Sequence, residues 1–296
     1  RDKGDPDPDV TGEFPGRILL RYSEDGGQTF LPADGEVRLD RLDDGDPQAE
    51  AAQPSVGCLA GGTAAVAWED WRAGEKQIFV AVTTDGGASW SDERRIDDAP
   101  EGTGARKPQV VVAGNDPVRI HVAWEDARDG IDDIYVTTSE DAGGTWSAPL
   151  RLTGSPEAGS TPVEDWDLAA EGDHVVLAWI DDRNGGDDFD VRDVFAVRSQ
   201  DGGASWSDEQ RLDTGTAPGG ADSHQLDLAA GESSYVAIYR DSRNELILSS
   251  DRRNSDVFTG GNGMPFDPDD ADDDGFVLGR DVCPNYPDPE QRDGDY

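Results

Sequence analysis

The chain has 296 residues, and its 65 Asp and Glu against 25 Lys and Arg give a formal net charge of −40. Such an acidic chain argues against nucleic acid or an anionic membrane surface as a partner and favours cations. No apolar stretch approaches the ~18 residues of a membrane span. Two cysteines, Cys58 and Cys283, are too few for a framework of disulfides, and we expect Cys58 to be a small core residue.

The first part of the chain predicts a linker followed by two strands. Residues 1–16 are rich in Asp and Pro without periodicity, which is typical of a linker. The abrupt start at Arg1 suggests a processed or cut N-terminus. Residues 17–23 (RILLRYS) and 36–40 then predict two strands that flank a turn with two glycines.

Three consecutive units follow, each with three short strands, a glycine-paired turn and a fourth strand. Alternating runs rich in β-branched residues and bounded by Gly, Asp and Pro predict these strands. A last unit, residues 225–259, is degenerate. The predicted strands are 54–60, 64–68, 77–83 and 93–96; 109–113, 119–124, 133–138 and 150–152; 166–170, 174–179, 194–198 and 210–212; and, in the last unit, 226–230, 235–239 and 245–249.

One eight-residue segment recurs at the turn of each unit, at intervals of 60, 56 and 60 residues. Such a period indicates stacked, equivalent units. Its Asp and Ser/Thr side chains can hydrogen-bond to local backbone, its glycines accept positive φ, and its aromatic residue can anchor the corner. A degenerate copy lies at residues 249–251. The good copies are Ser23–Phe30, Thr83–Trp90, Ser139–Trp146 and Ser199–Trp206, and their shared residues are Asp25, Asp85, Asp141 and Asp201.

This segment resembles the Asp box, S-x-D-x-G-x-x-W, of the sialidase-type β-propellers, also called the BNR repeat. The resemblance implies an all-β fold, a propeller of four-stranded antiparallel blades over residues 17–259. We expect about five blades, or six with missing or partner strands, because residues 17–40 supply only the outer two strands of a blade. In that family the Asp box is structural and lies away from the active site.

A second motif, aromatic-x-Asp-x-Arg, recurs between the second and third strand of each unit. In a propeller this loop opens on the face opposite the Asp boxes, and in sialidase-like propellers that face holds the ligand. The copies are Trp68-x-Asp70-x-Arg72, Trp124-x-Asp126-x-Arg128, Trp179-x-Asp181-x-Arg183 and Tyr239-x-Asp241-x-Arg243.

Two interpretations of this motif remain open. The arginines could grip a ligand carboxylate, with an Asp as general acid or base; the catalytic candidates are then Asp126, Arg128, Arg72 and Arg183, and the ligand-binding candidates Arg72, Arg128, Arg183, Arg243 and Trp71. Alternatively, each Asp–Arg pair ties neighbouring loops together. We favour the second interpretation, because a catalytic residue occurs once and not in every blade.

Other features also argue against catalysis. Sialidases carry Arg-Ile-Pro early in the propeller, and this chain has only Arg17-Ile18-Leu19. They use a Tyr nucleophile activated by a Glu, and the plausible candidates here, Tyr235 and Tyr239, lie in a strand pattern. The three histidines occupy unrelated positions, which does not suggest zinc. We expect Trp68, Trp124 and Trp179 to pack between blades, and Trp71 and Trp166 to be the exposed tryptophans.

Residues 260–296 differ in character and resemble an incomplete thrombospondin type 3 repeat, DxDxDG…DNCP…NPDQxDxD. Alternating carboxylates before a glycine suit Ca²⁺, so the resemblance implies a calcium-binding segment. The chain departs from the pattern at Leu278, Val282 and Asp288, and a disordered acidic tail is the alternative. The expected metal ligands are Asp270, Asp272, Asp274, Asp281, Asp288, Asp293 and Asp295.

Three functional hypotheses follow. We favour a secreted or cell-surface propeller that acts as a calcium-stabilised binding or structural module, with a glycan or another surface ligand as its partner. The alternative is an exo-acting glycoside hydrolase of sialidase type. A third hypothesis is self-assembly, in which strands of one chain complete the unfinished blade of another.

Overall fold

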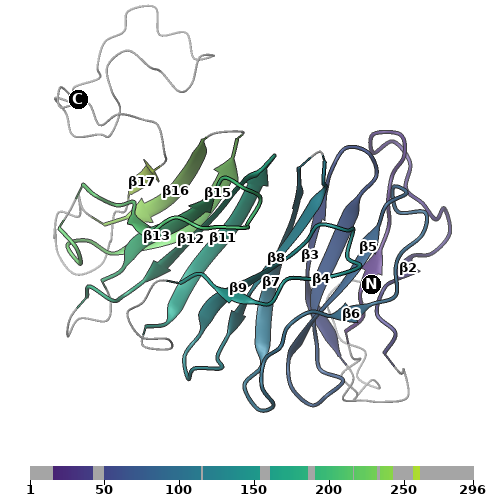
Figure 1. Cartoon of the computed structure of the whole chain (residues 1–296), viewed down its shortest axis with the longest axis horizontal. Helices are drawn as coiled ribbons and strands as arrows, with labels where there is room; N and C mark the ends of the chain where they lie inside the picture. Colours follow the sequence, from purple (N-terminus) through teal and green to yellow (C-terminus); the bar gives the residue numbers. More distant parts are fainter. Residues whose placement is uncertain are drawn as a thin grey trace, which may run out of the picture.

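The protein is described by a computed structural model, which covers residues 16–42, 50–114, 116–153, 161–185, 191–215, 217–231 and 234–242, and the backbone of 256–260. These residues form five antiparallel sheets, three of which have four strands (Figure 1). The all-β prediction is therefore confirmed. Within the described ranges, no helix is long and apolar enough to cross a membrane.

The five sheets follow one another along the chain. The first contains β1 (Leu19–Leu20) and β2 (Val37–Arg38). The three complete sheets contain β3 (Ala51–Cys58), β4 (Ala64–Asp70), β5 (Gln77–Thr83) and β6 (Arg94–Arg95); β7 (Ala105–Ala113), β8 (Arg119–Asp126), β9 (Asp133–Ser139) and β10 (Leu150–Arg151); and β11 (Val163–Glu171), β12 (His174–Asp181), β13 (Asp193–Ser199) and β14 (Gln210–Arg211). The last contains β15 (Ser223–Ala230), β16 (Tyr235–Asp241) and β17 (Asp256–Gly260).

The first strand of each unit begins earlier than the alternation of residue types predicted. Each of these strands contains a bulge close to its start. In three of them the bulge carries a residue with left-handed backbone, namely Gln53, Lys107 and Gln225, with φ between 50° and 54°. A bulge inserts an extra residue and interrupts the two-residue period, so the pattern becomes visible only after it.

The last unit departs from the prediction at its third strand. We expected that strand at residues 245–249, which lie outside the described residues. The strand that pairs with β16 is β17, in the register Asp241↔Asp256. The degenerate Asp box at 249–251 also lies outside the described part of the chain.

The sheets stand side by side in a row that follows chain order (Figure 1). The first strands of successive units contact one another: β3 contacts β7, β7 contacts β11, and β11 contacts β15. As expected, Trp68, Trp124 and Trp179 are fully buried, each in the apolar layer between its own sheet and the preceding one. Cys58 is exposed on β3, so the expectation of a core cysteine was wrong.

The turns formed by the four Asp boxes have the same hydrogen bonds. In the corner after β5, Asp85 Oδ1 accepts from the Ser89 amide at 2.9 Å and from Thr83 Oγ1 at 2.8 Å, and Asp85 Oδ2 accepts from Ser89 Oγ at 2.6 Å. These bonds, from Ser89 first, lower the pKa of Asp85 to about 2. Gly86 and Gly87 have φ of 74° and 100°, which favours glycine. Asp25, Asp141 and Asp201 accept the equivalent bonds.

A third repeated motif, Arg-x-Asp after the fourth strand, escaped the sequence analysis. In the sheet β3–β6, the buried Asp97 accepts from the Ile78 amide at 2.7 Å, and Arg95 donates to both of its oxygens. Asp40 is buried in the same way beside Arg38. The motif thus holds the outer strand against the third strand with a buried ion pair.

In the sheet β7–β10 the carboxylate of this motif comes from a different position, and the next sheet has a carboxylate at both positions. Thr153 stands at the usual Asp position, and Asp133 supplies the carboxylate that binds Arg151 at 3.2 Å. The sheet β11–β14 has both Asp193 and Asp213, each fully buried. Burial and the charge of Asp193 raise the pKa of the Asp213 carboxyl to about 6, although the hydrogen bond from Arg211 opposes the shift.

Candidate functional site

The face opposite the Asp boxes carries the hairpins that join the second and third strands. The Asp of each aromatic-x-Asp-x-Arg motif is the last residue of its second strand, in β4, β8, β12 and β16. All four carboxylates are buried: Asp70, Asp126, Asp181 and Asp241. The hairpins that follow therefore extend from fixed, buried anchor points.

In the first of these hairpins the Asp and the Arg form a bidentate pair. Arg72 Nε lies 2.8 Å from Asp70 Oδ1, and Arg72 Nη2 lies 2.6 Å from Asp70 Oδ2. The guanidinium also stacks on the Phe79 ring at 4.2 Å and donates to Glu93 at 2.6 Å. The hydrogen bond with Asp70 raises the pKa of Arg72 above its usual value. This arginine is thus held by its own hairpin.

The other two described copies also pair the Asp with the Arg, through two nitrogens of Arg183 but only Nη2 of Arg128. Arg128 donates to Asp126 at 2.7 Å and stacks on Tyr135 at 4.1 Å, and Arg183 donates to Asp181 and stacks on Phe195 at 4.1 Å. Each also binds a second carboxylate, Asp98 or Glu209. Such pairing supports the interpretation in which Asp–Arg pairs tie loops together. Arg243 lies outside the described residues.

The groups proposed for catalysis are enclosed. Asp126 is fully buried and accepts from the Trp124 indole at 3.2 Å. Tyr235 and Tyr239 are buried, and burial raises the pKa of Tyr235, which is the opposite of what a nucleophile needs. Trp166 is buried too and donates to Glu125 at 3.1 Å, so its expected exposure was wrong.

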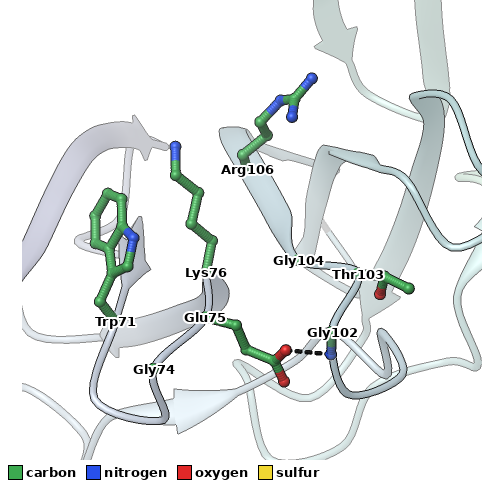
Figure 2. A pocket seen from close by; sticks show the side chains of 8 residues that line it. All are labelled: Trp71, Gly74, Glu75, Lys76, Gly102, Thr103, Gly104 and Arg106. Atoms are coloured by element: carbon green, nitrogen blue, oxygen red, sulfur yellow. Dashed lines mark hydrogen bonds between the residues drawn. The ribbon is translucent and has the colours of Figure 1, made fainter.

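One pocket of about 360 Å³ opens on this face between the sheets β3–β6 and β7–β10 (Figure 2). Its first wall is the hairpin after β4, which carries Trp71, Glu75 and Lys76; its second wall is residues 102–104 together with Arg106 of β7. Glu75 joins the walls by accepting from the Gly102 amide. Trp71, which the repeat does not require, therefore lies in a pocket wall.

Two buried glutamates, Glu69 and Glu125, bind the cationic side chains that line this pocket. Glu69 accepts from the Lys107 amide at 2.7 Å and lies 3.0 Å from Lys76 Nζ. Glu125 lies 2.8 Å from Lys107 Nζ and 2.9 Å from Arg106 Nε. Buried carboxylates need such partners, so the glutamates fix where the cationic groups stand.

This arrangement gathers positive groups on a very acidic chain. Lys76 and Lys107 are two of the three lysines in the whole sequence. Lys76 Nζ lies 4.8 Å from the centre of the Trp71 ring, and its side chain is 37% exposed. Arg106 is 40% exposed and pairs with Asp132 as well as Glu125, so both cations are held by carboxylates of the chain while they remain partly exposed. An aromatic face beside such cations can bind a ligand that has both a ring and an acidic group. The sequence analysis missed Lys76, Lys107 and Arg106. The rarity of lysine marks Lys76 and Lys107 as unusual, but nothing in the sequence places them or Arg106 at one pocket.

Asp270 and the other six carboxylates of the tail lie outside the described residues. Among the residues that the structure does describe, no group of three or more His, Cys, Asp or Glu could hold a metal ion.

Comparisons with known proteins identify one family. The family model described as "BNR repeat-like domain" matches residues 62–255. Comparison with curated proteins finds no match.

Solved structures with a similar fold share little sequence with this chain. The GH93 α-L-arabinofuranosidase of Fusarium graminearum is 19% identical, with a TM-score of 0.47 over 73% of this chain and 61% of that one. The α-L-arabinanase of Penicillium chrysogenum is 18% identical, with a TM-score of 0.49 over 74% and 64%. The NanB sialidase of Streptococcus pneumoniae is 10% identical, with a TM-score of 0.47 over 78% and 52%. The chain thus spans about three fifths of the first two and half of the third.

Proposed function

Because the chain belongs to the family of BNR repeat-like domains, we propose that it is a binding module that recognises a glycan carrying an acidic group. The ligand would occupy the pocket between the sheets β3–β6 and β7–β10. One observation carries this proposal: Trp71, Lys76 and Arg106 line a single pocket on the face opposite the Asp boxes. Aromatic rings suit the apolar face of a sugar, and cationic groups suit a carboxylate or a sulfate.

The state of the repeated arginines supports binding without hydrolysis. Arg72, Arg128 and Arg183 each donate to carboxylates of their own chain, although Arg128 Nε has no partner among the described residues. Releasing any of them for a substrate would leave a buried Asp without its partner, which is costly. The ligand-binding role that the sequence suggested is therefore proposed for Trp71 and not for these arginines.

An exo-acting glycoside hydrolase remains the second candidate, and one observation favours it, although sialidases themselves use a Tyr nucleophile. Glu69 and Glu125 are both bonded to Lys107 beside the pocket, and glycosidases commonly use two carboxyl groups. Both glutamates are, however, buried and bound to cations. We propose that they hold the pocket's cations and do not act on a substrate.

Binding and turnover distinguish the two candidates. We expect an array of acidic glycans to give a signal that Trp71→Ala abolishes. Phe30→Ala is the matched control, since this exposed aromatic residue lies in an Asp-box corner, and it should bind like the parent. Turnover of a fluorogenic sialoside that Glu69→Gln or Glu125→Gln abolishes would overturn the proposal and establish the hydrolase.

The tail adds a separate proposal, which rests on sequence alone. We propose that residues 260–296 bind Ca²⁺ and that the protein works outside the cell, where calcium is abundant enough for such carboxylate-rich sites. Chelation should then increase cleavage of the tail by a nonspecific protease. An unchanged digestion pattern with and without chelator would contradict the calcium site.

A further inference from the structure

The contact between neighbouring sheets is built the same way three times. At each contact, a side chain of one first strand accepts a hydrogen bond from the amide of the next first strand. The pairs are Ser55 Oγ with Val110 N at 3.0 Å, Gln109 Oε1 with Leu168 N at 3.0 Å, and Asp167 Oδ2 with Leu228 N at 2.8 Å. The strand pairings place these acceptors at equivalent positions, opposite Ala67, Ala123 and Ala178.

The last sheet has the residues for one side of such a contact, but no described sheet follows it to supply the other side. Val236 and Ile238 of β16 correspond by register to Val176 and Ala178 of β12, which are fully buried against the next sheet. Val236 is instead 47% exposed and Ile238 is 40% exposed. Asp227 stands at the acceptor position and is exposed, because no described strand follows β15 on that side.

The first complete sheet carries the other half. Val56 of β3 corresponds to Val110 of β7, since they pair with the equivalent residues Val66 and Val122. Val110 is 4% exposed, and Val56 is 64% exposed. Cys58 lies on the same face two residues later and is exposed as well. The Val56 amide occupies the donor position of the repeated hydrogen bond.

The strands at the two ends also complement each other. The first Asp box lies between β1 and β2, which therefore correspond to the third and fourth strands of a unit. β15 and β16 correspond to a first and a second strand. In Figure 1 these two sheets lie at opposite ends of the row, so the two halves do not meet within one molecule in this arrangement.

We propose that two copies of this chain associate head to tail, each end face packing on the opposite end face of the other copy. Val236 and Ile238 of one copy would cover Val56 and Cys58 of the second, and Asp227 would accept from the Val56 amide. The second copy's β1 would pair with the edge of β16 that β17 occupies in the single chain. Each of the two contacts joins the last sheet of one copy to the first complete sheet of the other. The two copies therefore form a closed ring with no free end face.

The mass in solution and two substitutions test this proposal. Light scattering after gel filtration should give twice the chain mass of 31.7 kDa. Ile238→Lys and Val56→Lys should each give the single mass, because either places a charge in the apolar contact. Leu150→Lys is the matched control, since Leu150 is 48% exposed on the outer strand β10, and it should keep the double mass. Melting curves verify that each variant is folded.

A second readout links the two faces directly. Ile238→Lys should raise the alkylation rate of Cys58 severalfold, measured on the peptide that contains it, although the two residues lie on different sheets. An unchanged rate would overturn the proposal, as would a wild-type protein that stays at the single mass. A dimer lost in Ile238→Lys but kept in Val56→Lys would also overturn it, because the two copies would then join through like faces.

Discussion

In the sheet β11–β14, Asp193 and Asp213 share Arg211, and this predicts how stability depends on pH. The folded pKa of Asp213, about 6, lies above its ordinary value of 3.8. Stability from this group is therefore fully present below pH 4 and is lost as the pH rises through 6. Asp193→Asn removes the neighbouring charge, so its melting temperature relative to wild type should rise between pH 4 and pH 7. A constant difference across this range would contradict the coupling.

The Asp boxes predict the opposite dependence at lower pH. Hydrogen bonds from Ser89 and Thr83 lower the pKa of Asp85 to about 2, below the ordinary value of 3.8. Stability from these bonds is present above pH 3.8 and is lost as the pH falls towards 2. Asp85→Ala should lower the melting temperature at pH 6, and by less at pH 2.5. Asp208→Ala, on an exposed residue, is the control and should change little at either pH.

At the level of single elements, the hairpins on the face opposite the Asp boxes depend on the buried Asp. Asp126→Ala would remove the buried acceptor that Arg128 and the Trp124 indole share, leaving Arg128 with the exposed Asp98 as its only carboxylate among the described residues. It should cost about 3 kcal/mol of unfolding free energy, as expected for half of a buried ion pair. Urea unfolding measures this. Arg41→Ala, which breaks an exposed pair with Asp92, should cost less than about 1 kcal/mol. Equal costs would contradict the anchoring role.

The elements show how far the sequence could be interpreted. The second and third strands of the three complete units were predicted within a few residues, because they are continuous runs rich in apolar residues, as in β5 (Gln77–Thr83). The bulged starts of the first strands were missed, since a left-handed residue such as Lys107 breaks the period. The buried ion pair of Arg95 and Asp97 was missed because Arg-x-Asp is short and common in so acidic a chain.

At the scale of the whole molecule, the candidate site depends on how the sheets pack. Trp71 could be proposed from the sequence, because it lies next to a repeated motif without being part of it. Lys76 and Arg106 could not, because only the contact between two sheets places them at one pocket. The tie between Asp and Arg was the favoured of two interpretations of their recurrence, and in the three described copies the structure adds an aromatic ring under the guanidinium.

The net charge of −40 predicts how salt affects association of the whole molecule. Two copies this acidic repel each other, while the proposed contact itself is largely apolar. Salt at about 0.5 M shortens the Debye length to a few ångströms, so the dimer fraction should increase with added NaCl. Light scattering at low and high salt measures this. Dissociation on adding salt would contradict an apolar contact and indicate one made of ion pairs.

Calorimetric titration of an acidic oligosaccharide into the protein tests the proposed pocket most directly. We predict that Lys76→Met weakens binding at least tenfold, about 1.4 kcal/mol, whereas Lys76→Arg, which keeps the charge over Glu69, retains most of the affinity. Lys76→Arg should match wild type in melting temperature, whereas Lys76→Met should melt lower because it leaves the buried Glu69 without its cation. Binding is therefore compared at a temperature at which melting curves show all three proteins to be folded. Affinity that is the same in all three proteins would contradict the assignment of this pocket as the glycan site.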